Sequence, residues 1–195
     1  MNRLHSFPKL DRARGVGLVE VLITMVVLAF GLLGLAAFQA KAHVGTIESY
    51  QRAQASVLLQ DMQARLSANA ANAGGYITPA PLGTGSTLDT DCAAAAAGKD
   101  RDLCEWNLAL KGAAEQRSGN NAGAMQGARG CIELVRDKND APGVCTPAVY
   151  LVTVAWQGMH ATRAPAQACG KDQYGTDTHR RTVSARVAVG LPACT

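Results

Sequence analysis

Six cysteines are the most reactive side chains of this 195-residue chain, and all of them lie beyond residue 90. They are Cys92, Cys104, Cys131, Cys145, Cys169 and Cys194. None of them forms a C-x-x-C pair, the spacing typical of zinc sites and redox motifs. An even number of unclustered cysteines favours disulfide bonds, which form in oxidising compartments. We therefore expect all six to be paired, with the region beyond residue 90 outside the cytoplasm.

Proximity along the sequence favours the pairs Cys92–Cys104, Cys131–Cys145 and Cys169–Cys194. Cys131 and Cys145 flank a stretch, 137–143, that has the composition of a turn, so a hairpin there could bring them together. The sequence alone does not determine the connectivity.

The sequence predicts no catalytic site, because the residues that could do acid–base chemistry are scattered. Its four histidines are His5, His43, His160 and His179, and the first two lie far from the cysteine-rich region. No metalloprotease, nucleophile-elbow or P-loop spacing is present. We expect no catalytic residue, no cofactor and no enzymatic activity.

Two pairs of side chains could be considered for calcium. Asp137 and Asn139 imitate the start of a calcium loop, but position 141 is alanine and no glutamate closes the loop, which favours a surface turn. Asp172 and Asp177 are the second candidate pair. We therefore predict no metal site.

One carboxylate lies directly against a long apolar run. Glu20 precedes residues 21–38, which are 18 residues without a charge. As a helix, such a run is just long enough to cross a hydrocarbon core. An ionisable group in a membrane is costly and normally has a dedicated partner, so Glu20 indicates a function. The alternative for Glu20 is a position at the membrane interface, solvated by headgroups.

The positive charge of the chain is concentrated before this run. Residues 1–15 contain four basic side chains and one acidic one, which accounts for most of the net charge of +4. The positive-inside rule keeps these residues cytoplasmic and places the cysteines on the far side. Basic residues confined to one terminus also argue against a nucleic-acid groove, which clusters charge on a folded face.

The segment from Arg14 to Ile23 resembles the class III signal of type IV prepilins. In that signal a basic leader ends in glycine, and glutamate is the fifth residue after the cut; Gly15 and Glu20 stand in these positions. The resemblance implies that a prepilin peptidase cuts between Gly15 and Val16 and that Val16 becomes N-methylated. It also implies that Glu20 pairs with a terminal amine in the assembled filament and so sets axial register.

Residues 27–39 resemble the minor pilins of the PilV (type IV pilus modification protein) family, with Gly31, Gly34 and Gln39 in the expected register. The whole resemblance covers residues 14–39. The sequence departs from the pattern in two ways: Gly17 replaces a bulkier residue, and no proline interrupts 21–40. Gly31 and Gly34 supply either flexibility or close helix packing, and the sequence does not choose between them.

The resemblance implies a minor pilin that is held in the bacterial inner membrane by one span and takes part in priming pilus assembly at the tip. Its globular part would lie in the periplasm and, after assembly, at the cell surface. Its partners would be the prepilin peptidase, other minor pilins, the major pilin and a tip adhesin, with no nucleic acid. Two alternatives remain: a type II secretion pseudopilin, which has the same leader, and a secreted or anchored disulfide-rich enzyme. A cleavable secretory signal ending at 40–42 belongs to the second alternative, and Glu20 argues against it.

The apolar run continues into a helical pattern that we expect to reach about Asn72 and to end at Gly74 and Gly75. One stripe of this helix is apolar, and the remainder is charged. The stripe consists of Val44, Ile47, Ala55, Leu58, Met62 and Leu66, and the charged residues are Lys41, Arg52, Asp61 and Arg65. This amphipathic part needs a globular cover on one side.

After an irregular connection over 74–100, Asp102 and Glu105 are spaced as a capping box that opens a short helix. Trp106 shares a face with Leu103 and Leu110 in this helix, and we expect it to be a core residue. A Gly/Asn-rich loop is predicted over 119–130.

Three strands follow. They are predicted over 131–135, over 149–156 and over 182–189, with a polar loop over 157–179. The second is apolar on both faces and should be central, whereas the third alternates and should be half-buried. The predicted fold class is α+β, with the type IV pilin arrangement of a long amino-terminal helix on an antiparallel sheet. The predicted segments are a leader (1–15), a helix (16–73, with its transmembrane part at 21–38) and a disulfide-linked globular domain (74–195).

Overall fold

The computed structural model describes residues 17–88, 91–113, 116–118, 120–121, 125–141 and 143–190. The chain forms two compact units, Met1–His43 and Val44–Thr195. Helix α1 (Leu18–Ala68) begins in the first unit and ends in the second. We call the second unit, Val44–Thr195, the head.

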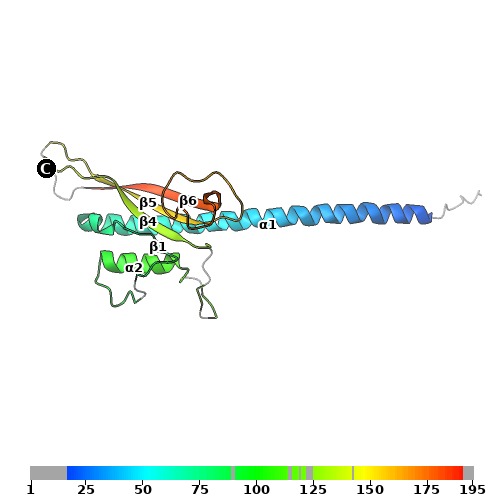
Figure 1. Ribbon diagram of the computed structural model, residues 1–195, viewed down its shortest axis with the longest axis horizontal. Coiled ribbons are helices and arrows are strands. Elements are labelled where there is room, and N and C mark those ends of the chain that lie inside the picture. Colours follow the sequence, from blue (N-terminus) through cyan, green and yellow to red (C-terminus); the bar gives the residue numbers. More distant parts are fainter. Residues whose placement is uncertain are drawn as a thin grey trace, which may run out of the picture. The chain divides into compact units, whose positions relative to one another are not determined.

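A four-stranded antiparallel sheet forms the centre of the head, with strand order β1-β4-β5-β6 (Figure 1). Its strands are β1 (Leu82–Gly83), β4 (Arg129–Arg136), β5 (Ala148–Gln157) and β6 (Arg180–Val189). The three strands expected from the sequence are confirmed, and β5 lies between β4 and β6, as its apolar composition predicted. A small hairpin of β2 (Gln116–Arg117) and β3 (Asn120–Asn121) was not expected. The prediction of a loop over 119–130 is therefore wrong at β3 and at the start of β4.

The carboxy-terminal half of α1 covers one face of this sheet and supplies much of the core (Figure 1). Its buried apolar residues are Ala55, Leu59, Met62 and Leu66, which contact the same cluster as the β5 residues Val152 and Val154. The predicted apolar stripe is confirmed at Ala55, Met62 and Leu66. It is wrong at Ile47, which is 45% exposed. The face of α1 that the sheet covers is centred on Gln51, Ala55 and Leu59. Ile47 lies at the border of this face and is therefore exposed.

The long helix ends earlier than expected. The chain leaves α1 at Ala68 and continues as a 3₁₀ helix, η1 (Ala70–Tyr76). The prediction that Gly74 and Gly75 end the helix is wrong, because both lie within η1. Asparagine side chains explain the change: the Asn72 amide donates to Asn69 Oδ1 at 2.9 Å, and Asn69 donates to the Tyr76 hydroxyl at 3.0 Å. Such local bonds compete with α-helical geometry.

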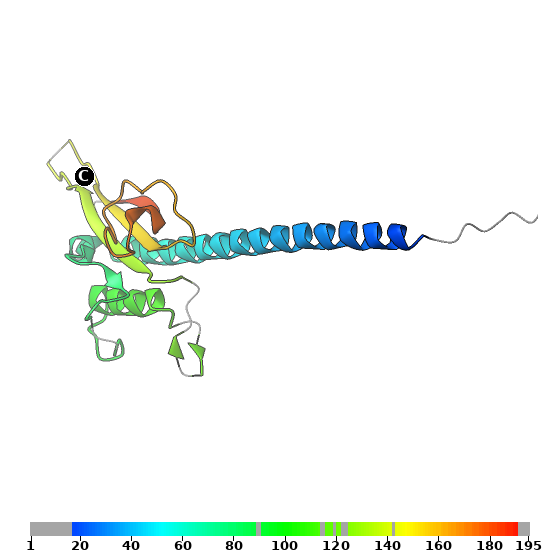
Figure 2. The ribbon, with the colours of Figure 1, turned by 45° about the vertical axis from the view of Figure 1, so that its right-hand side comes forward.

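Helix α2 (Lys99–Leu110) packs against α1 through a buried tryptophan; it is the green helix of Figure 2. Trp106 is fully buried, and its indole Nε1 donates to the Leu58 carbonyl of α1 at 2.9 Å. The ring also lies against Gly130 of β4, where no side chain separates ring from strand. The prediction that Trp106 is a core residue is confirmed.

Two disulfide bonds are placed among the described residues, and one of them was predicted. Cys92 is bonded to Cys104, as sequence proximity suggested, and Cys131 is bonded to Cys169. Cys145 is also disulfide-bonded, and none of the described cysteines is free. Cys194 lies outside the described residues.

The predicted pairs Cys131–Cys145 and Cys169–Cys194 are wrong, because Cys131 is bonded to Cys169. β4 continues for five residues beyond Cys131 before the chain turns, and at about 3.3 Å per residue this carries the chain too far for a bridge back from Cys145. Cys131 instead faces the side of the sheet opposite Ile132, where it packs with Ala155, Cys169 and Tyr174. The loop between β5 and β6 covers this side and is therefore tied to the sheet (orange in Figure 2).

Candidate functional site

The first candidate site is the beginning of α1. Gly17 precedes the helix, and its carbonyl accepts hydrogen bonds from the backbone amides of Glu20 at 2.9 Å and Val21 at 3.3 Å. Glu20 is exposed in the first helical turn, where a carboxylate is favoured by the positive end of the helix dipole. Gly15 and Val16, the predicted cleavage and methylation positions, lie outside the described residues.

The surface that follows Glu20 is apolar on every side of the helix. The most apolar 18-residue window of α1 has a mean hydropathy of 2.6, and none of it is buried within the chain. By length and composition this helix could cross a membrane. Within the first unit, its exposed large apolar residues are Leu18, Val19, Val21, Leu22, Ile23, Met25, Val26, Val27, Leu28, Phe30, Leu32, Leu33, Leu35 and Phe38. An apolar surface of this extent needs lipid or other protein around it.

Gly31 and Gly34 lie within this helix without interrupting it. A Cβ atom at either position would meet nothing within 4 Å, so no contact inside the chain requires glycine there. Alanine would favour the helix by up to about 1 kcal/mol at each position. What these glycines contribute must therefore lie in flexibility or in contacts with other molecules.

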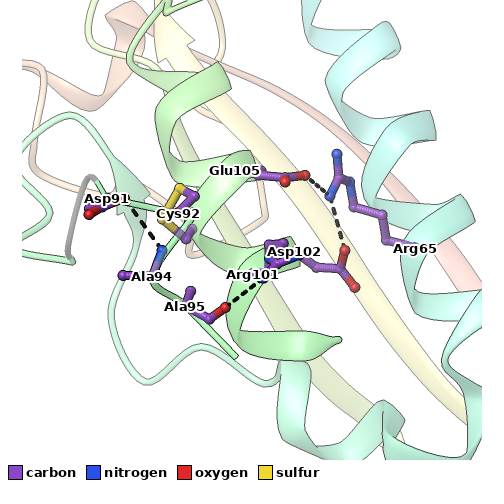
Figure 3. The surroundings of a disulfide bond; sticks show 9 residues. Arg65, Asp91, Cys92, Ala94, Ala95, Arg101, Asp102 and Glu105 are labelled. Carbon is purple, nitrogen blue, oxygen red and sulfur yellow. Dashed lines mark hydrogen bonds and ion pairs between the residues drawn. A yellow bond between two sulfur atoms is a disulfide. The ribbon is translucent and has the colours of Figure 1, made fainter. Parts of the chain in front are cut away.

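A second group of chemically active side chains joins α1 to α2 in the head (Figure 3). The Arg65 guanidinium donates through Nε to Asp61 at 3.0 Å and through Nη1 to Asp102 at 3.0 Å and Glu105 at 2.6 Å. Burial alone lowers the pKa of Arg65, but the hydrogen bonds to these three carboxylates reverse this effect and leave the pKa above its ordinary value. The arginine therefore stays charged and holds both helices.

This arrangement corrects one prediction and adds to another. The capping box at Asp102 and Glu105 is wrong: α2 begins at Lys99 after Gly98, so both carboxylates lie inside the helix and face Arg65. Arg65 was predicted to lie outside the apolar stripe of α1, and from there it joins the two helices. The Asp61–Arg65 spacing of four residues was a local signal, but nothing in the sequence linked it to α2.

Tyr76 extends the same group. Its hydroxyl donates to the second carboxylate oxygen of Asp102 at 2.5 Å and accepts a bond from Asn69. Burial, and then the hydrogen bond to Asp102, raise the pKa of Tyr76 to about 12. The phenol therefore stays protonated at physiological pH and acts as a structural donor.

A third group lies in the loop between β5 and β6. Arg180 is only 1% exposed, and it donates to Asp177 through Nε at 2.6 Å and through Nη2 at 2.8 Å. It also donates to three loop carbonyls, those of Pro165, Gln167 and Cys169. The hydrogen bonds from Arg180 lower the pKa of the Asp177 carboxyl. A single buried cation thus fixes the path of the loop, a role that sequence reasoning did not assign to Arg180.

This geometry bears on the calcium candidates. The Asp177 carboxylate accepts two hydrogen bonds from Arg180, which lower its pKa together with a smaller effect from the Asp172 backbone amide. The Asp137 carboxylate accepts a hydrogen bond from the Lys138 backbone amide, and the Asn139 side-chain oxygen accepts one from the Ala141 backbone amide in a local turn. Among the described residues, no group of three or more His, Cys, Asp or Glu side chains is arranged to hold a metal ion.

The histidines in the described part of the chain lie apart from one another, and His179 is the one that contacts a side-chain hydroxyl. His43 is exposed in the first unit, His160 uses its carbonyl to accept from Arg181, and His179 shares a bond with the Thr176 hydroxyl at 2.9 Å. His5 lies outside the described residues.

Comparison with known proteins gives one match. The prokaryotic N-terminal methylation motif matches residues 10–36, a segment that contains Gly15, Val16 and Glu20 and most of the apolar run. No curated protein and no solved structure is significantly similar to the chain. The matched motif and the exposed apolar helix that follows it support a type IV pilin-like prepilin, either a pilin or a pseudopilin, whose role is structural.

Proposed function

We propose that the protein is a minor pilin of a type IV pilus, of the PilV kind, that takes part in initiating or priming pilus assembly at the tip. The observation that carries this proposal is the methylation motif over residues 10–36 at the start of an apolar helix that is exposed in the isolated chain. The resemblance of residues 27–39 to minor pilins supports the finer assignment. A subunit with this role does not need a substrate-binding site.

Maturation would divide the chain as follows. Residues 1–15 form a cytoplasmic leader, which a prepilin peptidase removes by cutting between Gly15 and Val16, and Val16 then becomes N-methylated. Residues 16–73 form the pilin helix, with 21–38 in the inner membrane, and 74–195 form the disulfide-linked globular domain in the periplasm. Glycine suits the cut site because it has no Cβ to obstruct close approach of the peptidase to the backbone.

Glu20 would set the register of assembly. When apolar helices bundle together in a filament, its carboxylate becomes a buried charge, which is strongly unfavourable unless a cation pairs with it. The new amino group of Val16, on the same or a neighbouring subunit, is the natural partner. The structure offers Glu20 in the first turn, with its side chain exposed and so accessible to a neighbour.

The partners implied are the prepilin peptidase, other minor pilins, the major pilin and a tip adhesin. The subunit would be held in the inner membrane before assembly and would reach the cell surface with the pilus. A type II secretion pseudopilin has the same leader and is the second candidate. Deleting the gene separates the two: loss of pili with secretion intact supports a minor pilin, and the reverse result supports a pseudopilin.

Amino-terminal sequencing of the purified mature protein tests the maturation step. We expect methylated Val16 as the first residue and expect Gly15→Glu to remain as the full precursor in the membrane. Arg14→Lys keeps the charge beside the cut and should mature normally. A first residue near 43, or normal maturation of Gly15→Glu, would contradict the prepilin assignment and favour a cleaved secretory signal.

A further inference from the structure

A groove of about 630 Å³ lies along the irregular segment 77–88 of the head. Most of its lining comes from this segment, and the rest comes from Leu103 of α2, Arg129 of β4 and Gln173 of the β5–β6 loop. Ile77 and Leu88 are each about two-fifths exposed, so apolar surface is available beside polar hydroxyls. No part of the pilin assignment uses this groove.

Arg129 supplies a fixed positive charge to the groove. Its Nη1 donates to the Gly127 carbonyl at 3.1 Å, and its Nη2 makes a long contact of 3.4 Å with Gln173. The guanidinium also lies 5.0 Å from the centre of the Tyr174 ring, and the Tyr174 hydroxyl donates to the same Gly127 carbonyl. These contacts hold the side chain in place.

None of these contacts neutralises that charge. Within the described residues Arg129 forms no ion pair, and the groove lining contains no aspartate or glutamate. A second cation is near, because Lys111 Nζ donates to the Ser86 carbonyl at 3.1 Å. A preorganised arginine without a carboxylate partner is a favourable site for an incoming carboxylate, which it can bind with two parallel hydrogen bonds.

The backbone of the segment favours an extended chain as the occupant. Pro79 and Pro81 keep it irregular, and the described contacts leave the amides of Ala80, Gly85 and Thr87 without an acceptor. Strand β1, which lies in this segment, is also the edge of the sheet; its Gly83 amide already donates to Asn107 of α2 at 2.8 Å, so the unpaired amides lie on either side of β1. Unpaired main-chain groups beside a sheet edge are the feature to which extended peptides add.

We propose that this groove binds an extended acidic peptide segment of a partner protein, with one carboxylate side chain paired to Arg129. The carboxylate supplies the charge that the groove lacks, and the peptide backbone supplies acceptors to the free amides. This proposal concerns the head alone, and it stands or falls separately from leader cleavage.

The test uses the full chain in detergent micelles and a fluorescent pentapeptide of threonine-valine-glutamate-valine-threonine with blocked ends. Two matched peptides carry glutamine or lysine at the centre. We expect the glutamate peptide to bind with a Kd below about 1 mM, the glutamine peptide to bind about tenfold more weakly, and the lysine peptide not to bind. Arg129→Gln should weaken the glutamate peptide about tenfold and leave the glutamine peptide unchanged.

Two variants control this experiment. Arg186→Gln removes an exposed arginine of β6 that lines none of the head's described hollows, and it should leave binding unchanged. Arg129→Lys keeps the charge above Tyr174 but loses the planar guanidinium, so it should bind the glutamate peptide less tightly than the wild type and more tightly than Arg129→Gln. This variant tests the role of Arg129 even if Arg129→Gln unfolds. Equal binding of the three peptides, or no saturable binding up to about 1 mM, would overturn the proposal. Displacement of the peptide by acetate at the peptide's own concentration would show a site for free carboxylates and overturn the peptide part.

Discussion

Replacing Gly130 with alanine should destabilise the head through one steric conflict. A Cβ atom at this position would lie 2.5 Å from Trp106 Cζ3, closer still to Cη2, and 2.7 Å from Leu110 Cδ1. Ordinary carbon–carbon contacts are about 3.5–4.0 Å, so the ring must move by about 1 Å. β4 cannot yield easily, because Gly130 is paired with Leu82 on one side and Val154 on the other.

The size of the effect follows from what the ring loses. Overpacking of a tight core costs about 1–3 kcal/mol, and moving the indole also weakens its 2.9 Å bond to the Leu58 carbonyl, which is worth about 1 kcal/mol. A total of about 3 kcal/mol corresponds to a fall in Tm of about 9 °C for a unit of this size.

Thermal unfolding of the full chain in micelles, followed by tryptophan fluorescence, measures this fall. Gly45→Ala is the matched control: its Cβ would meet nothing within 4 Å and it lies inside α1, so it should raise the Tm slightly. Combining Gly130→Ala with Trp106→Phe should cost less than the sum of the two single changes, because the smaller ring leaves room for the methyl group. A fall below about 2 °C for Gly130→Ala, or strict additivity in the double variant, would refute the reasoning.

Three further predictions concern assembly, the disulfides and pH. Glu20→Leu should abolish co-purification with partner pilins without lowering the subunit's own thermal stability, whereas Thr24→Leu, one turn further along, should leave co-purification intact; equal recovery of both variants contradicts the register role. Peptide mapping of the unreduced protein should recover Cys131 linked to Cys169 and no free thiol, and a peptide linking Cys131 to Cys145 would contradict the fold. Asp177→Asn should reduce the free energy of unfolding at neutral pH. Arg180 lowers the pKa of Asp177 in the folded state. The contribution of this pair to the free energy of unfolding is therefore present above the unfolded-state pKa, near 4, and is lost as the pH falls through the lower folded-state pKa. Chemical unfolding at several pH values should therefore show that the free energies of unfolding of Asp177→Asn and the wild type converge below about pH 4. A difference between them that does not depend on pH would contradict the charge pairing.

Much of the fold could be predicted because its signals are local. Apolar periodicity located the three long strands and the buried side of α1, and the composition of β5 identified it as the central strand. Trp106 was identified as a core residue for the same reason, since a large apolar ring beside two leucines of one helical face is rarely exposed.

Two of the errors came from interactions between distant parts of the chain. Asp102 and Glu105 have the spacing of a helix cap, but Arg65, 40 residues before Glu105, determines their role. Cys131 is nearer in sequence to Cys145, but the length of β4 and the face on which Cys131 lies select Cys169 instead. In both cases a tertiary contact overrides the local pattern. The helix end at Ala68 is different, because it depends on short-range bonds from Asn72 to Asn69 and from Asn69 to Tyr76, which the glycines further on do not reveal.

The unusual residues of the amino-terminal segment, unlike those of the head, are not explained by contacts within the chain. In the head, unusual residues have explanations inside the chain: Gly130 makes room for Trp106, and buried Arg180 holds loop carbonyls. In the first unit, Gly31 and Gly34 meet nothing, and the apolar side chains around them are exposed. Folding of a single chain gains nothing from these features, and the glycines weaken the helix. The exposed apolar side chains are useful when lipid or other protein surrounds the helix, and the glycines contribute either flexibility or the close approach of such a neighbour. The sequence of this segment is therefore better explained by what surrounds the helix than by the fold of one subunit.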